Sequence, residues 1–308
     1  MATEIELKCM MSQANLAEAE KWMLGVGAMR AHSVKLVNRY YDTPDRQLNK
    51  HKIALRIREK EGKFFQTLKT KGSSVGGLHQ RNEWEWSLAR DALDLSLLAG
   101  TAWPEVLIGQ PLAPLFETNF VRQQMMLNWG DSSIEVALDR GEVFSGGQMM
   151  PIQELELELL SGSHRDILSL ARQMAQTIPF HVSDVSKGER GYYLAGVLHY
   201  DPPDHFEGVI GSDSTSLTKS WVKGVDLAYL TGNSGYLVSS LGALMALKGT
   251  LARTQHTHKN ALIEWLSKEY VRLEEILSLP ALPRFSEVLV AGSLSEANAL
   301  LTLLTTAD

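Results

Sequence analysis

Two segments of the chain carry carboxylates at every second position. Residues 4–8 read Glu-Ile-Glu-Leu-Lys, and residues 154–158 read Glu-Leu-Glu-Leu-Glu. Successive side chains of a strand point to opposite faces, so each run places its carboxylates on one face and its apolar residues behind them. Like charges on one strand face repel each other unless a positive group lies against them. The sequence offers two sources of that charge, a divalent metal ion and the basic strands that lie between the two runs.

The basic segments follow the same alternation. Arg56 and Arg58 share one strand face, and Lys69 ends the next strand-like segment. About eight such strands, with few long helices among them, predict an antiparallel sheet that closes on itself. Eight strands close into a barrel that is wide enough for one small ligand. Further charged residues on these or later segments are Arg81, Glu83, Glu85, Arg122, Glu135, Asp139, Lys187 and Arg190.

An ordinary half-solvated sheet would also alternate charged and apolar residues, with the charges facing water. Such a face usually mixes both signs, whereas here Glu-x-Glu recurs at both ends of the region and Arg-x-Arg stands alone between them. Buried charges are tolerated only when they are paired or bound to metal. A lumen that holds both carboxylates and cations would therefore suit a metal ion together with a polyanion.

These motifs, in this order, resemble the CYTH or triphosphate tunnel metalloenzyme superfamily, and most closely its inorganic triphosphatases. The resemblance covers about residues 1–200. It rests on Glu4-x-Glu6-x-Lys8, Leu-Arg-Ile-Arg at 55–58, Lys69, Ala-Leu-Asp at 137–139 and Glu-Leu-Glu at 154–156. The longer phrases at residues 76–81, 139–143 and 154–162 carry the closer likeness to the triphosphatases.

The resemblance implies an α+β fold built on an eight-stranded antiparallel β tunnel that binds inorganic triphosphate with Mg²⁺ or Mn²⁺ and hydrolyses it. It implies metal binding by Glu4, Glu6, Asp139, Glu154, Glu156 and Glu158. It implies phosphate binding by Lys8, Arg56, Arg58, Lys69, Arg81, Arg122, Lys187 and Arg190. We expect the catalytic set to be Glu4, Glu6, Lys8, Arg56, Arg58, Lys69, Glu154 and Glu156. The chain departs from the resemblance at Gln124, where a second basic residue is expected two positions after Arg122.

The chemistry of these residues agrees with that implication. Carboxylate oxygens suit Mg²⁺ and Mn²⁺, and phosphoryl transfer needs positioning and charge neutralisation more than a covalent nucleophile. No protein general base stands out, so a water activated by one of two metal ions is the expected nucleophile. Other functions on the same fold remain open: a class IV adenylate cyclase, a thiamine or nucleoside triphosphatase, or a polyphosphate-binding module without turnover.

Composition limits the other classes. The net charge of −6 argues against nucleic acid as a partner. The single Cys9 excludes an internal disulfide, and without an amino-terminal signal pattern we expect a cytoplasmic protein. The apolar stretch at 236–251 is judged too short and polar to span a membrane. We interpret four histidines as surface residues because they lack metal-ligand partners at useful spacing: His79, His181, His256 and His258.

The character of the chain changes near residue 200. We predict a tunnel domain at 1–200, a proline-marked linker at 201–215 and a helical domain at 216–308. Helical spacing of apolar residues predicts helices at 216–230, 236–255, 257–279 and 285–305. In proteins that the chain resembles, a longer and more basic CHAD domain occupies this position. From residue 209 this chain has eight Lys and Arg against nine Asp and Glu. We therefore favour a packing or interaction module over polyphosphate binding, with an unknown protein partner.

Overall fold

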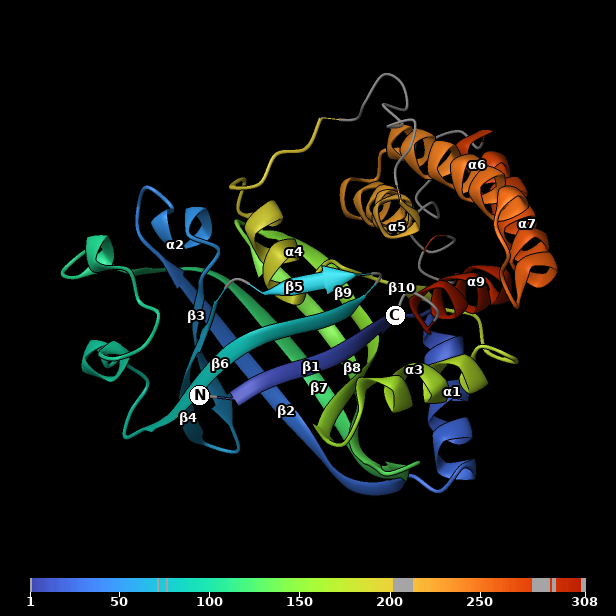
Figure 1. Cartoon of the computed structure of the whole chain (residues 1–308). Coiled ribbons are helices and arrows are strands. Elements are labelled where there is room, and N and C mark those ends of the chain that lie inside the picture. Colours follow the sequence, from blue (N-terminus) through green and yellow to red (C-terminus); the bar gives the residue numbers. More distant parts are fainter. Residues whose placement is uncertain are drawn as a thin grey trace.

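Long antiparallel strands wrap around a central lumen in the computed structural model, which describes residues 2–70, 72–75, 77–201, 213–278, 289 and 292–305 (Figure 1). The strands are β1 (Ala2–Met10), β2 (Met29–Asp42), β3 (Ala54–Lys60), β4 (Lys63–Lys69), β5 (Ser73–Val75), β6 (Leu78–Leu88), β7 (Ala113–Trp129), β8 (Ser132–Ser145), β9 (Gln148–Ser161) and β10 (His181–Val182). Their order is β10-β1-β9-β8-β7-β2-β3-β4-β6-β5, and a further pairing of β1 with β6 closes the ring. The predicted closed barrel of eight antiparallel strands is confirmed.

The register of the strands brings the charged runs side by side. On β1 and β9, Glu6 lies opposite Glu158 and Lys8 lies opposite Glu156. On β1 and β6, Glu4 lies opposite Arg81. Since side chains alternate along each strand, these pairings place both carboxylate runs and a basic residue on the lumen face.

The apolar face of the same strands supports the barrel from outside. Leu7 and Cys9 of β1 and Leu155 and Leu157 of β9 are fully buried in one large hydrophobic core. Helices α1 (Gln13–Gly25) and α3 (His164–Met174) and the C-terminal helices contribute to this core. Burial of each large apolar side chain of this kind stabilises the strands by about 1.5–3 kcal/mol.

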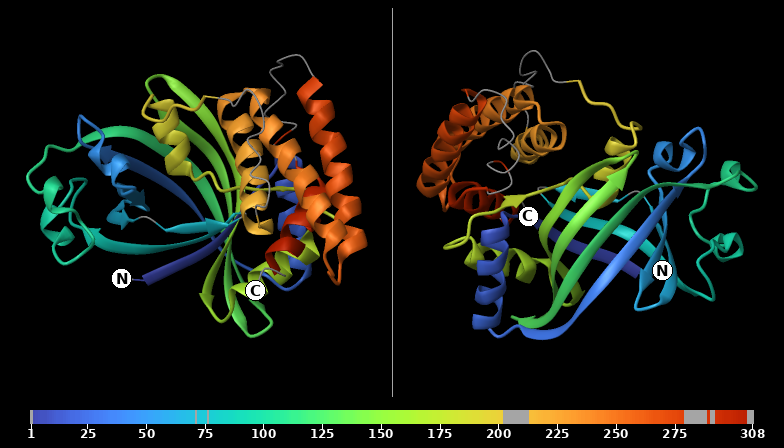
Figure 2. Two further views of the ribbon diagram at one scale, coloured as in Figure 1. Left: turned by 45° about the horizontal axis from the view of Figure 1, so that its top comes forward. Right: turned by 180° about the vertical axis from the view of Figure 1, so that it is seen from behind.

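A short helix, α4 (Lys187–Leu194), closes one end of the lumen. It packs against β7, β8 and β9 (Figure 2). A Cβ atom on Gly191 would lie 2.0 Å from Cδ2 of Phe116, so only glycine allows the helix to approach β7 this closely. The Tyr192 ring packs edge-on against Phe116, and Tyr40 stacks on the other side of that ring. Aromatic packing therefore fixes α4 inside the barrel wall.

The C-terminal helices gather on one side of the barrel, next to α1 and α3 (Figure 1). They are α5 (Ser214–Thr231), α6 (Leu237–Arg253), α7 (Lys259–Ser278) and α9 (Leu294–Thr305). All four predicted helices have a counterpart, although residues 285–288, 290 and 291 of the last prediction lie outside the described residues. Most of the predicted linker, residues 202–212, also lies outside them. By length and composition alone, Ser234–Arg253 could cross a membrane, contrary to our expectation. The core helix of a protein outside the membrane passes the same test, and α6 packs against both α5 and α7.

Four shorter elements lie outside the barrel wall. They are α2 (Gln47–Lys50) and the 3₁₀ turns η1 (Leu95–Leu98), η2 (Glu105–Leu107) and η3 (Ser234–Tyr236). The buried Asp42 holds α2 in place, because its carboxylate accepts hydrogen bonds from the backbone N–H groups of Leu48 and Asn49 at 2.8 and 3.2 Å. The helix α2 packs against β2 and β3.

Candidate active site in the tunnel

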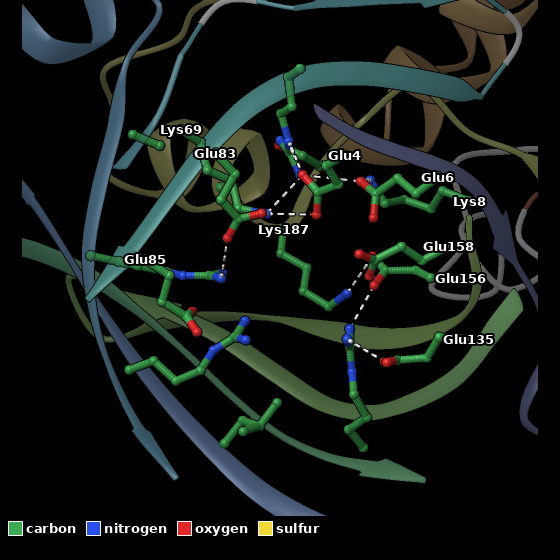
Figure 3. A pocket seen from close by; sticks show the side chains of 18 of the residues that line it. Glu4, Glu6, Lys8, Lys69, Glu83, Glu85, Glu135, Glu156, Glu158 and Lys187 are labelled. Atoms are coloured by element: carbon green, nitrogen blue, oxygen red, sulfur yellow. Dashed lines mark hydrogen bonds and ion pairs between the residues drawn. The ribbon is translucent and has the colours of Figure 1, made fainter. Parts of the chain in front are cut away.

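The lumen contains a cavity of about 760 Å³ whose walls are mostly charged (Figure 3). Its size lies within the range that small-molecule sites occupy in proteins. The predicted site residues that line it are Glu4, Glu6, Lys8, Arg56, Arg58, Lys69, Arg81, Arg122, Glu156, Glu158 and Lys187. Most of the charged residues that the alternation singled out therefore surround one cavity.

The two carboxylates of β1 are held by cations from β4 and β6. Lys69 Nζ lies 2.9 Å from Glu4 Oε1, and Arg81 Nε lies 2.7 Å from Glu4 Oε2. Arg81 also donates to Glu6 at 3.1 Å. Burial alone would raise the pKa of Glu4, but Lys69 and Arg81 outweigh it and hold that pKa well below its usual range. Glu4 is therefore ionised at neutral pH.

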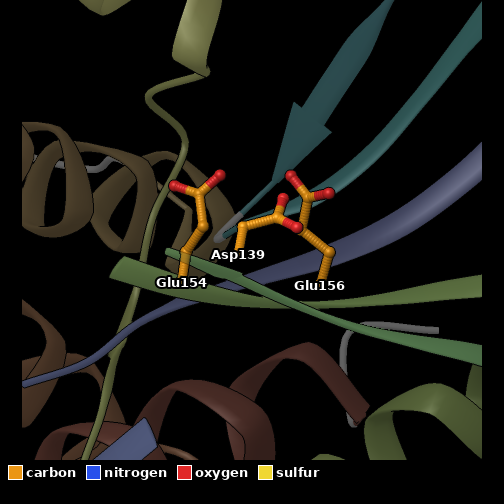
Figure 4. A group of neighbouring side chains, drawn as sticks. All are labelled: Asp139, Glu154 and Glu156. Atoms are coloured by element: carbon orange, nitrogen blue, oxygen red, sulfur yellow. The ribbon is translucent and has the colours of Figure 1, made fainter. Parts of the chain in front are cut away.

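A second group of carboxylates comes from β8 and β9. One oxygen each of Asp139, Glu154 and Glu156 lies within 4.8 Å of the others (Figure 4). Asp139 and Glu154 are completely buried and are not among the described residues that line the cavity, whereas Glu156 is 8 % exposed and does line it. Of these three predicted metal ligands, only Glu156 lines the cavity, and the three oxygens lie close enough together to hold one metal ion.

Built-in cations neutralise this second group. Lys187 Nζ lies 2.7 Å from Asp139 and 2.9 Å from Glu156, and it also contacts Glu154. Arg122 donates to Asp139 at 2.7 Å and to Glu156 at 2.6 Å. These cations, Lys187 first and Arg122 second, outweigh burial and hold the pKa of Glu156 well below its usual range.

Arg190 also belongs to this cluster rather than to the cavity surface. It is completely buried, contacts Glu154 and donates to the carbonyl oxygen of Pro151 at 3.0 Å. Arg190 is not among the described residues that line the cavity. Its position suits support of Glu154 better than contact with a phosphate.

A third group of carboxylates lacks comparable neutralisation. Glu158 faces the cavity together with Glu135, which the sequence analysis did not assign to the site. Burial and then the charges of Glu4, Glu135 and Glu6 raise the pKa of Glu158 to about 8. A divalent cation among these oxygens would relieve their mutual repulsion, so the donor set fits Mg²⁺ or Mn²⁺.

Arg58 on the opposite wall shows the converse imbalance. Burial and then the charges of Arg56 and Arg122 lower the pKa of Arg58 to about 10. Arg58 donates to Asn38 Oδ1 at 2.7 Å. Arg56 donates to Tyr40 Oη at 3.2 Å, but its Nε has no hydrogen-bond partner among the described residues. Arg56 lies 3.9 Å from Glu83, so the repulsion falls mainly on the half-buried Arg58, which favours an anionic ligand beside it.

Several residues that line the cavity were not predicted as site residues from the sequence. They are Glu135, Glu83, Glu85, Tyr40, Lys60 and Ser186. Glu135 and Asp139 lie four positions apart on one strand, so alternation places both side chains on the same face. This was the sequence signal that could have identified Glu135. Gln124, where the resemblance implied a cation, lines the cavity and donates to Glu135.

The interpretation of His79 and His181 as surface residues is wrong. His181 is 1 % exposed and lies between the carboxylates of Asp226 and Glu296. His79 is buried near the carbonyl oxygen of Ser183 at 3.3 Å. His181 is covered by residues of α5 and α9, and His79 of β6 lies against the backbone of Ser183. The spacing of the sequence cannot show contacts between residues so far apart in the chain.

Comparison with known proteins agrees with this geometry. The CYTH domain family matches residues 2–192. A Haemophilus influenzae protein named inorganic triphosphatase is 35 % identical over 199 residues, which make up 63 % of this chain and 55 % of that protein. The chain thus spans about half the length of this curated relative.

Two solved structures resemble the fold. A Hippeastrum protein assigned as an adenylyl cyclase and described as having a dominant triphosphatase activity is 20 % identical, with a TM-score of 0.47 over 64 % of this chain and 97 % of its own. A Bacillus halodurans protein assigned as an adenylate cyclase is 23 % identical, with a TM-score of 0.40 over 62 % and 98 %. These scores are too low to support an argument about function. The family match covers more than half of the chain, including every lumen residue described above, and the chain belongs to the CYTH domain family.

Proposed function

We propose that this protein hydrolyses inorganic triphosphate to pyrophosphate and phosphate inside the tunnel, with Mg²⁺ or Mn²⁺ as cofactor. The observation that carries the proposal is the double charge imbalance of the lumen. Glu135 and Glu158 repel each other on one wall, and Arg56 and Arg58 repel each other on another. A metal ion and a polyanion together would neutralise both walls. The name of the Haemophilus relative supports this substrate.

The carboxylates that line the cavity would hold the metal. They are Glu4, Glu6, Glu135, Glu156 and Glu158. When bound, the metal would neutralise phosphate oxygens and activate a water molecule for attack on phosphorus. Asp139 and Glu154 would act from behind this wall, because they hold Lys187 and Arg122 in place.

The basic residues of the chain would bind and orient the triphosphate. Arg56 and Arg58 can each donate two parallel hydrogen bonds to phosphate oxygens, a geometry that lysine lacks. Lys8 would neutralise a further oxygen from the β1 wall. In the reaction, the water oxygen bonds to the terminal phosphorus, the bond from that phosphorus to the bridging oxygen breaks, and pyrophosphate leaves with the electron pair. One proton of the water stays on the released phosphate and the other passes to solvent.

Phosphate release from a panel of substrates tests the proposal. Inorganic triphosphate should be hydrolysed faster than pyrophosphate, ATP or thiamine triphosphate. EDTA should abolish the activity, and excess Mg²⁺ or Mn²⁺ should restore it. Turnover that EDTA leaves unchanged would refute the metal requirement. Faster hydrolysis of ATP or thiamine triphosphate, or formation of a cyclic nucleotide from ATP, would assign a different substrate to the same tunnel.

A further inference from the structure

A buried aspartate of the C-terminal helices binds the segment that leads into the active site. Asp226 of α5 is completely buried. Its carboxylate accepts hydrogen bonds from Ser183 Oγ at 2.6 Å and from the backbone N–H of Asp184 at 2.9 Å, and His181 Nε2 lies 2.9 Å from it. All three partners belong to residues 181–184. No residue of α5 is among the described residues that line the tunnel cavity.

This segment connects β1 to Lys187. The backbone N–H of Ser183 donates to the carbonyl oxygen of Lys8 at 3.1 Å, which extends the pairing of β10 with β1. The Ser183 hydroxyl also accepts from the backbone N–H of Val185 at 3.1 Å. Ser186 then caps α4, whose first residue is Lys187. Asp226 therefore fixes the backbone three residues before the lysine that neutralises the acidic cluster.

The same face of α5 also contacts α4 itself. Tyr229 lies three positions after Asp226, so both side chains project from one face of the helix. The buried Tyr229 hydroxyl faces the guanidinium of Arg190, which contacts Glu154. Helix α5 thus contacts the approach to α4 through Asp226 and its middle through Tyr229.

The aspartate is itself held from α7 and α9. His181 lies between Asp226 and Glu296 of α9, and Arg272 of α7 donates to Glu296 at 2.9 Å. Burial lowers the pKa of His181, but Glu296 and Asp226 outweigh burial and raise that pKa to about 10. The imidazolium therefore bridges two carboxylates at neutral pH. Three helices converge on the residues that Asp226 holds.

We propose that the C-terminal helices are part of the active-site framework, and that Asp226 is a positioning residue that acts through Lys187. The kinetic consequence of this role rests on the proposed triphosphatase activity, whereas its structural consequence does not. In the variant Asp226→Asn, an amide NH2 group replaces one of the two carboxylate oxygens. It would lie either opposite the backbone N–H of Asp184, or opposite the Ser183 hydroxyl and the His181 ring. One donor of the segment is left without an acceptor in either orientation. The start of α4 then loses its fixed position.

A double-mutant cycle gives the kinetic test. Asp226→Asn should lower kcat/KM for triphosphate about ten- to a hundredfold in the otherwise wild-type protein, as loss of an outer-shell partner typically does. In the Lys187→Ala background the same change should cost less than about threefold, because the group through which it acts is gone. Equal losses in both backgrounds, within about twofold, would overturn the proposal. The matched control is Glu274→Gln, which removes one negative charge from an exposed position on α7 and should leave kcat/KM unchanged.

Amide hydrogen exchange gives a test that needs no activity. Exchange of residues 183–194 should be faster in Asp226→Asn than in wild type and unchanged in Glu274→Gln, while β7 and β8 keep their protection. Unchanged exchange at residues 183–194 in Asp226→Asn would overturn the proposal. A wild-type protein without triphosphatase activity would refute the proposed function alone, and hydrogen exchange would then decide the role of Asp226.

A milder variant covers failure to fold. If Asp226→Asn melts below the assay temperature, Ser183→Ala takes its place in both tests. It removes the hydrogen bonds of the Ser183 hydroxyl with Asp226 and with the N–H of Val185 and keeps the contact of Asp226 with His181. Its loss in kcat/KM should be smaller, and it should again disappear in the Lys187→Ala background. A loss that persists there in full would overturn the proposal.

Discussion

Replacement of Arg58 by methionine should stabilise the ligand-free protein and weaken its action on triphosphate. The arginine is half-buried in the lumen, and loss of solvent together with Arg56 and Arg122 lowers its pKa from 12.5 to about 10. A cation whose pKa is depressed on folding is disfavoured in the folded state at neutral pH. Methionine keeps much of the side-chain volume and removes the charge.

The structure sets the size of this effect. The pKa drop corresponds to ~3 kcal/mol of unfavourable interaction in the folded protein. The substitution also removes the hydrogen bond from Arg58 to the buried Asn38, which offsets ~1 kcal/mol of the gain. The net stabilisation of ~2 kcal/mol should raise Tm by about 3 °C for a chain of this size. In the same variant kcat/KM should fall about ten- to a hundredfold, because a charge-assisted hydrogen bond to phosphate is lost.

The matched control is Arg122→Met, for which the expected sign is opposite. Arg122 is bound to Asp139 and Glu156, so its removal leaves buried carboxylates short of one cation. Breaking a buried ion pair on one side costs about 3–5 kcal/mol, and Lys187, which remains bound to both carboxylates, should keep the cost near the lower limit. The free protein should therefore melt at a lower temperature than wild type.

Thermal melts with and without triphosphate, in the presence of EDTA to prevent turnover, distinguish these cases. If ligand-free Arg58→Met melted at a temperature as low as that of Arg122→Met, the interpretation that neighbouring cations repel Arg58 in the lumen would be refuted. If Arg58→Met instead gained as much Tm as wild type on addition of triphosphate, Arg58 would not contact the substrate.

Two further predictions concern the carboxylates and the histidine. Glu6→Gln and Glu156→Gln should each lower kcat on the order of 10²-fold in steady-state assays, because each removes a charge from the proposed metal site; a variant with near wild-type kcat would lose its place in the site. Because the folded pKa of His181 is raised to about 10 from 6.5, its contribution to stability should be complete below pH 6.5 and lost as the pH rises towards 10. Urea unfolding of wild type and His181→Gln at pH 6, 8 and 10 measures it, and a constant difference in unfolding free energy would contradict the raised pKa.

Strand alternation predicted the lumen face of the barrel because its cause is local. In Glu4-x-Glu6 and Arg56-x-Arg58 the side-chain direction follows from the backbone of the strand itself. Once the strands close into a ring, each of these residues must face either the lumen or the outer core, and the apolar partners between them occupy the core. The cavity and most of its lining were therefore predictable from the sequence.

The sequence did not predict which charged residues line the cavity and which lie behind its wall. Whether Glu154 lines the cavity or lies behind it depends on Lys187 and Arg190, which a helix inserts into the barrel end. The burial of His181 depends on Asp226 and Glu296, which lie 45 and 115 positions away in the chain. Contacts at such separations leave no periodic signal in the sequence.

The distribution of charge along the lumen explains why a metal ion and a polyanion would belong to one site. Near α4, the carboxylates Asp139, Glu154 and Glu156 are paired with cations of the chain itself. Further along, burial and the charges of Glu4, Glu135 and Glu6 raise the pKa of Glu158, and burial and the charges of Arg56 and Arg122 lower the pKa of Arg58. Since burial weakens solvent screening on both walls, neither ligand alone can balance the lumen. A metal bound to a triphosphate carries both missing charges in one ligand.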